Sequence, residues 1–335
     1  MGRDNVAETS AGGGGPGDKP GKARWLPVGI MFALALIGGA VLAWPQLKTN
    51  KEFELGAYRT SLIVLEQLAH VDPGVQGAVS IAHEWIGDVL YDQGKLEEAL
   101  ASYRASLAIR EQLTNDQPSN AVWQRGLSFT HSMIGDMLSD QEKHDEALES
   151  YLASLAIRER LAADHPDDAR LQRDLSVIYI RVGDALYLQG EFDEALASYR
   201  ESITIREVLA GTDASNAEEQ HDLSVIHGRI GNVLAAEGML DEALASFRNA
   251  LAIAERVAAT NTSNADWRWD VVLWQSELAQ RGDDPERRWA FIVAEMRKDV
   301  NLLRPDRARF LSMAEQQLAK VGEAQAAPQR ATAPP

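Results

Sequence analysis

The chain has 335 residues, of which 45% are hydrophobic, and this is enough to bury an extended core. It carries 33 basic and 50 acidic side chains, and the formal charge of −17 argues against nucleic acid as a partner. There is no cysteine in the sequence, which excludes disulfides, thiol catalysis and thiolate metal sites.

The first 45 residues differ in character from the rest. Residues 1–24 contain a glycine-rich run without apolar periodicity, so we expect a flexible tail. Residues 25–45 begin with twenty uncharged residues that are bounded by Trp25 and Trp44. Twenty helical residues extend about 30 Å, the hydrocarbon thickness of a bilayer, and tryptophan prefers the membrane interface. The pattern predicts one transmembrane helix.

The same segment also indicates where in the cell the folded part of the protein lies. A cleaved signal peptide is the alternative to a permanent anchor, because Val41 and Ala43 suit a cleavage site, although the segment is long for a signal. Basic residues lie closer to the N-terminal end of the span than to its other end, which favours a cytoplasmic N-terminus. We therefore expect a single-pass protein of the inner (cell) membrane, with its folded part outside the cytoplasm.

Residues 46–263 repeat with a constant period. The tripeptide Ile86-Gly87-Asp88 returns, with small changes, at intervals of 48 residues, at residues 134–136, 182–184 and 230–232. A constant period without insertions indicates one supersecondary unit stacked on itself, and this favours a binding scaffold over an enzyme.

Each unit is predicted to form two helices. In residues 168–212, Asp168 is the expected N-cap of helix A, Gly190 its expected end, and acidic residues then begin helix B. Helix A has an internal glycine and helix B an alanine in every unit, and we expect these small residues to face each other. They are Gly87, Gly135, Gly183 and Gly231 on helix A, and Ala99, Ala147, Ala195 and Ala243 on helix B.

The flanks of the repeats are partial units. Residues 52–70 match helix B alone. Residues 264–323 are predicted to form capping helices, with Pro285 and Pro305 at two helix starts. The Ala/Pro-rich residues 324–335 are expected to be a tail.

Four consecutive units, over roughly residues 76–260, resemble the tetratricopeptide repeat (TPR) family, as residues 168–212 illustrate. The residues at the family's spacing are Gly183, Leu186, Gly190, Phe192, Ala195 and Tyr199. The usual period is about 34 residues, so each helix here is about two turns longer. The chain resembles long-repeat, membrane-anchored bacterial TPR proteins, and this implies an all-α solenoid of antiparallel helix pairs.

The resemblance also implies a concave, peptide-binding groove formed by the A helices. The residues expected to line it are Asp88, Tyr91, Asp136, Asp184, Tyr187 and Asn232. A row of carboxylates beside tyrosines suits a protein or peptide ligand that carries lysine or arginine. The alternative is that these side chains are solvated or bond between repeats.

The sequence shows no arrangement of residues for catalysis, a metal or a cofactor, since its seven histidines are scattered and no phosphate-binding loop occurs. We therefore expect a membrane-tethered scaffold for protein–protein interaction, by analogy in cell-envelope assembly or protein maturation. The alternatives are a cytoplasm-facing signalling adaptor and a structural platform made of self-associated copies.

Overall fold

The computed structural model describes residues 51–212, 216–298, 302 and 305–331, and within these ranges the chain is entirely helical apart from turns. The prediction of an all-α solenoid is confirmed for this part of the chain. The tail at residues 1–24 and the predicted transmembrane segment at residues 25–45 lie outside the described residues. Of the helices that are described, none is long and apolar enough to cross a membrane.

Twelve α-helices and one short 3-10 helix follow one another along the described chain. They are α2 (Lys51–Ala69), the 3-10 helix η2 (Pro73–Val75), α3 (Gln76–Asp92), α4 (Leu96–Asp116), α5 (Ala121–Asp140), α6 (His144–Asp164), α7 (Ala169–Gln189), α8 (Phe192–Thr212), α9 (Ala217–Ala236), α10 (Leu240–Thr260), α11 (Ala265–Gln280), α12 (Pro285–Lys298) and α13 (Pro305–Ala331).

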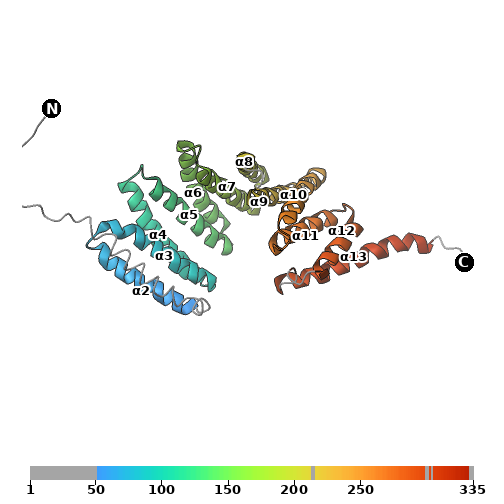
Figure 1. Cartoon of the computed structure of the whole chain (residues 1–335), viewed down its shortest axis with the longest axis horizontal. Coiled ribbons are helices and arrows are strands. Elements are labelled where there is room, and N and C mark those ends of the chain that lie inside the picture. The colour runs from blue at the N-terminus through green and yellow to red at the C-terminus, as the bar shows by residue number, and fades with distance from the viewer. Residues whose placement is uncertain (1–50, 213–215, 299–301, 303–304, 332–335) are drawn as a thin grey trace, which may run out of the picture.

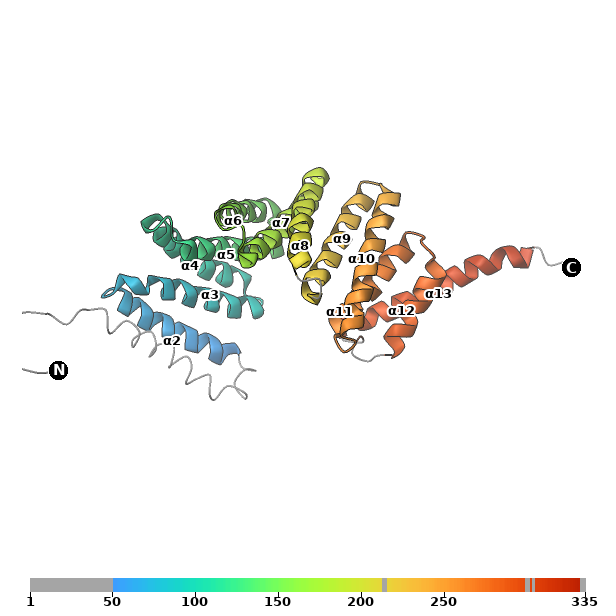
Figure 2. The same cartoon turned by 45° about the horizontal axis from the view of Figure 1, so that its top comes forward.

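Each helix packs mainly against its neighbours in sequence, so the array is a solenoid. The pairs α3/α4, α5/α6, α7/α8 and α9/α10 are the four 48-residue units, numbered one to four below. The array curves into an arch with α8 at its crest (Figure 1), and α9, α10 and α11 lie side by side when the view is turned (Figure 2). Helix α2 is the predicted lone helix B.

Capping residues set the helix ends at the predicted places. The side chains of Asn120, Asp168, Asn216 and Asn264 accept hydrogen bonds from the first backbone N–H groups of α5, α7, α9 and α11. Gly190 ends α7 with φ of 83°, in the left-handed region that glycine adopts without strain. Pro285 and Pro305 are the first residues of α12 and α13.

The C-terminal helix is longer than predicted. Helix α13 continues to Ala331, past residue 324, where the sequence predicts the start of a tail. Alanine and glutamine are strong helix formers, and they dominate residues 324–327. Helix propensity therefore extends α13 into a segment whose proline content indicated a tail.

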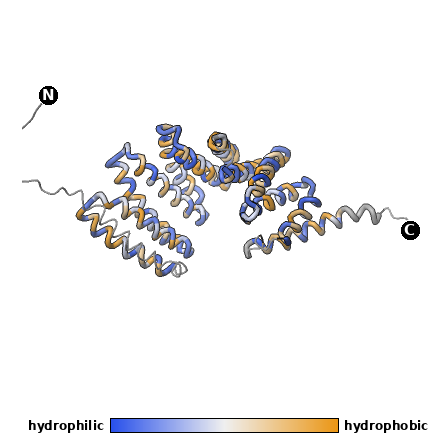
Figure 3. Tube along the Cα trace, in the orientation of Figure 1, coloured by the Kyte–Doolittle hydropathy of each residue, from blue (hydrophilic) through white to orange (hydrophobic). Residues whose placement is uncertain are grey.

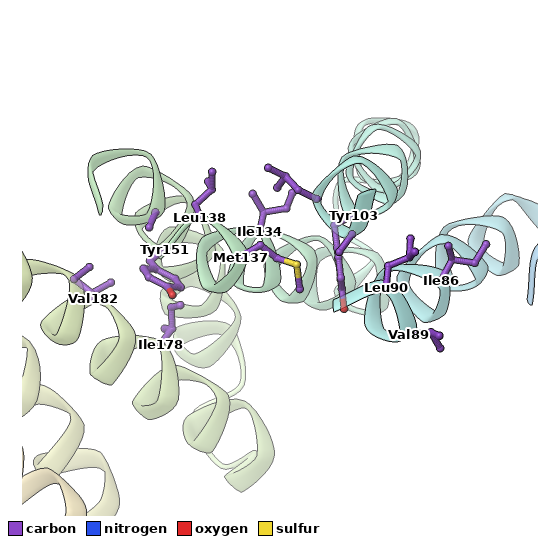
Figure 4. Packing of buried hydrophobic residues seen from close by; sticks show 14 of the residues in the cluster. Ile86, Val89, Leu90, Tyr103, Ile134, Met137, Leu138, Tyr151, Ile178 and Val182 are labelled. Carbon is purple, nitrogen blue, oxygen red and sulfur yellow. The ribbon is translucent and has the colours of Figure 1, made fainter. Parts of the chain in front are cut away.

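The core runs between the helices along the length of the arch. Apolar and polar residues alternate along the helices (Figure 3), so the helices bury one side and expose the other. One buried cluster joins α2 to α7, and a second continues from α8 to α11. The rings of Tyr103 and Tyr151 lie inside the first cluster (Figure 4).

The atoms nearest to the internal glycines belong to aromatic rings of helix B. A Cβ atom on Gly183 would lie 2.6 Å from the ring of Tyr199, which sits sixteen residues further on in helix B. The other units repeat this contact with the rings of Tyr103, Tyr151 and Phe247. The nearest neighbour of each glycine is therefore a ring of helix B, and the alanines of helix B that the sequence placed opposite the glycines are fully buried. The glycine makes room for a flat aromatic ring against the backbone of helix A.

We predict that Gly183→Ala destabilises the chain by about 1–3 kcal/mol, because its methyl group would overlap the Tyr199 ring. Gly211→Ala in α8 is the matched control, since a Cβ atom there meets nothing within 4 Å. Alanine also favours the helix, so the control is expected to be neutral or stabilising by up to about 1 kcal/mol. Urea unfolding of both variants measures the difference, and equal stabilities would contradict the packing argument.

Candidate binding groove

One face of the odd-numbered helices is open to solvent and hollowed. A cavity of about 350 Å³ lies between α5, α7 and α9, and a cavity of about 390 Å³ lies between α7, α9 and α11. Both are lined by Asp184 and Arg229, so they adjoin and form a groove along the solenoid. Asp136 lines the first of them, and Tyr187 and Asn232 line the second. The structure therefore brings four of the six predicted groove residues together.

Each aspartate of the column at Asp88, Asp136 and Asp184 is bonded within its own unit. The hydroxyl group of Tyr151 donates to Asp136 at 2.9 Å, and that of Tyr199 donates to Asp184 at 2.6 Å. Tyr103 makes the same bond to Asp88. Phe247 has no hydroxyl in the fourth unit, and there Asn232 replaces the aspartate. The tyrosine that packs on the glycine therefore also positions the carboxylate.

Two of the carboxylates are further bonded to the next unit. The guanidinium group of Arg181 donates two hydrogen bonds to Asp136, at 2.7 and 2.8 Å, and Arg229 donates to Asp184 at 2.6 Å. In the second unit the equivalent of Arg181 is Met133, so no arginine occupies this position beside Asp88. Bonding between repeats, the alternative to ligand contact, is therefore what Asp136 and Asp184 show.

The two predicted tyrosines have different surroundings. Tyr91 donates to Asp140 of the next unit at 2.5 Å, and neither Tyr91 nor Asp88 lines the two cavities. Tyr187 packs against Phe192 with ring centroids 5.8 Å apart. Asp88 is exposed and bonded only to Tyr103 among the described residues, so it is the carboxylate of the column most available to a cationic ligand.

The B helices carry a column of buried arginines, which the sequence analysis did not predict. Arg110, Arg158 and Arg206 recur every 48 residues and are 7%, 7% and 2% exposed. Arg110 donates two hydrogen bonds of 2.8 Å to Glu84, and Arg206 donates to Glu219 at 2.6 Å and to Asp222. These two members are therefore neutralised by carboxylates.

Arg158 differs from both of the other arginines. Serine (Ser132) stands at the position that Glu84 occupies in the first unit, and Leu171 stands where Glu219 stands one unit later. Its hydrogen bonds go to the Ser128 hydroxyl at 3.3 Å and to the backbone carbonyl of Asp174 at 2.6 Å. Burial lowers the pKa of the Arg158 guanidinium to about 10. Within the described ranges, Arg158 has no ion pair.

We predict opposite consequences for two equivalent substitutions. Arg206→Met takes the buried cation from Glu219 and Asp222 and leaves Glu219 paired only with the partly exposed Arg173, so it should cost about 1–3 kcal/mol. Arg158→Met removes a buried charge that has no carboxylate partner, so stability should change by less than about 1 kcal/mol or should rise. Urea unfolding of the two variants tests this contrast. A large loss in Arg158→Met would show that Arg158 is electrostatically paired.

His221 on α9 makes a polar contact to α11, the next helix A along the solenoid. His221 Nε2 lies 2.7 Å from Asp270, and its Nδ1 lies 3.7 Å from Asp222. The two carboxylates, Asp222 first, raise the pKa of His221 to about 9. The imidazole is therefore charged at neutral pH and connects α9 to α11.

We predict that His221 stabilises the fold below pH 6.5, its pKa in the unfolded chain. Because the folded pKa is raised, this contribution is lost as the pH rises from 6.5 through about 9. The difference in unfolding free energy between the natural chain and His221→Asn should fall by about 2 kcal/mol between these limits. A difference that does not change with pH would show that His221 is not charged in the fold.

Comparison with known proteins agrees with this architecture. Residues 86–118 and 130–207 match family models of the tetratricopeptide repeat. A crystal structure of BtubC (BKLC) from P. vanneervenii is similar with a TM-score of 0.51 and 16% identity, covering 85% of this chain and 94% of that chain. The apo form of RapI is similar with a TM-score of 0.50 and 16% identity, covering 82% and 72%. No curated protein matches.

Residues 86–118 and 130–207 are therefore similar to tetratricopeptide repeats, and the two structures share the helical solenoid fold of this chain. Repeats of this kind are scaffolds for protein–protein interaction, in which the stacked units present an extended binding surface.

Proposed function

We propose that the chain is a membrane-tethered scaffold whose groove binds a segment of a partner protein. The observation that carries the proposal is the pair of adjoining cavities along α5, α7, α9 and α11. Their linings combine apolar side chains such as Val177 and Val225 with the bonded Asp136 and Asp184. Apolar contacts beside fixed polar groups are what an extended or helical peptide needs for affinity and orientation.

The charges of the groove indicate where a cationic residue of the partner would lie. Arg181 and Arg229 already compensate Asp136 and Asp184, so a basic ligand gains little beside them. Asp88 is exposed and lies one helical turn before Tyr91, whose hydroxyl group donates to Asp140. A lysine or arginine of the partner is therefore expected at Asp88, one unit before the groove residue Asp136.

The location and pathway belong to the same proposal. Residues 25–45 would tether the chain to the inner membrane, and the repeats would lie outside the cytoplasm, where a role in envelope assembly or protein maturation fits by analogy alone. A cytoplasm-facing adaptor is the second candidate, and a topology reporter fused after Pro335 distinguishes the two. Self-association into a structural platform is the third, and light scattering tests it.

We predict that Val177→Glu combined with Val225→Glu weakens partner capture at least about tenfold, because charges would enter both cavities. The matched control is Val208→Glu on α8, whose valine is 66% exposed and lines neither cavity. Quantitative crosslinking with the full chain as bait measures capture of each co-purifying protein. Equal capture by the double variant and the control would place the binding surface elsewhere.

The same assay tests the cationic contact. Asp88→Asn should lower capture about threefold and reduce its dependence on salt, because one exposed ion pair contributes about 0.2–1 kcal/mol. If Asp88→Asn captures partners as well as the natural chain at low salt, the proposed contact with a basic residue is wrong, and the proposal that the groove binds a partner is unaffected.

A further inference from the structure

A third cavity has the opposite charge from the rest of this acidic chain. It has a volume of about 400 Å³ and lies between the N-terminal halves of α5 and α7 and the C-terminal halves of α4 and α6. Its lining consists of Arg110, Arg125, Arg158, Arg170, Asp174, Val122, Gly126 and Phe129. Four guanidinium groups thus meet around one carboxylate, in a chain whose formal charge is −17. We call this cavity the arginine pocket.

Glycine at position 126 opens the arginine pocket. A Cβ atom on Gly126 would lie 1.7 Å from Nη1 of Arg110, so this guanidinium group rests against the bare backbone of α5. Helices α7, α9 and α11 have Asp174, Asp222 and Asp270 at the equivalent position. The glycine therefore both makes room for Arg110 and removes a carboxylate that α7, α9 and α11 retain.

The one carboxylate of the lining is already used. Asp174 accepts a 2.6 Å hydrogen bond from Arg125, and it offers Arg158 only its backbone carbonyl. Arg158 is 7% exposed and carries a charge without an ion pair in the described part of the chain. Arg170 is exposed at the mouth and likewise has no ion pair there. Arg158 and Arg170 can thus both turn to a ligand.

The balance of charge indicates the kind of ligand. The four arginines face Asp174 within the pocket and Glu84 behind Arg110, so two positive charges are left uncompensated. We infer that the arginine pocket binds a phosphoryl dianion, whose oxygens accept hydrogen bonds from guanidinium groups of several helices. A single carboxylate would leave one of the two charges without a partner. Val122 and Phe129 at the rim provide an apolar border to the site.

The inference is independent of the proposed function, because phosphate can be titrated without any partner protein. With inorganic phosphate as the probe, calorimetry on the full chain at low chloride should show one saturable site. Arg158→Met should weaken binding at least about tenfold, whereas Arg200→Met, at an exposed arginine outside the pocket, should leave it unchanged.

A second variant guards against a folding defect in Arg158→Met. Ser132 of the second unit is equivalent to Glu84 of the first unit, which pairs with Arg110, so Ser132→Glu places a carboxylate where it can pair with Arg158. The Ser132 hydroxyl is buried without a hydrogen-bond partner. The new carboxylate should pair with Arg158, keep the fold and abolish phosphate binding. Absence of binding up to about 10 mM phosphate, or natural affinity in both variants, would overturn the inference.

Peptide probes distinguish the source of the group. A phosphoserine peptide that binds more tightly than inorganic phosphate would place the dianion on a partner protein, and equal affinity would indicate free phosphate or a small ester. If the glutamate version of the peptide binds as tightly as the phosphoserine version, the pocket recognises a carboxylate, and the phosphoryl assignment is wrong.

Discussion

The contact between a glycine of helix A and an aromatic ring of helix B is the constraint on which each repeat depends. Because Gly183 has no side chain, the ring of Tyr199 lies directly against the helix backbone, and its hydroxyl reaches the carboxylate of Asp184. One side chain thus fixes both the spacing of the buried helices and a polar group of the groove. Where Phe247 removes the hydroxyl, the carboxylate is absent as well, at Asn232.

Polar bonds between units are the second level of organisation. Arg181 and Arg229 reach back to the preceding unit, so the groove is lined by charges that the fold itself compensates. In the buried arginine column, Arg110 and Arg206 are likewise compensated by carboxylates of the fold, whereas Arg158 is not. Small departures from the repeat, among them Ser132 and Leu171, therefore create a local excess of positive charge inside an acidic molecule. The stacked units supply the framework, and the departures supply local chemistry.

The sequence predicted what depends on periodicity and on local chemistry. The helix pairs, the Asx caps and the two proline starts all follow from patterns within a few residues. The partner of Gly183 did not, because spacing alone does not say whether an alanine or a ring lies nearest. The joint change to Asn232 and Phe247 could have revealed the Asp–Tyr bond. The arginine pocket could not have been found this way, since it depends on whether Asp174 turns toward Arg125 or Arg158.

The regular offset of the bonds between units has a consequence for how such a chain can change in length. Arg181 bonds to Asp136 and Arg229 to Asp184, each 45 residues back. If residues 137–184 were excised, Arg229 would meet Asp136 in the place of Arg181, and the groove would close up by one unit with its charges still matched. The arginine pocket would not survive, because Arg206 would arrive beside Arg110 with Glu219 already bonded to it. Loss of a module would thus shorten the scaffold with its groove charges still matched, while erasing the arginine pocket.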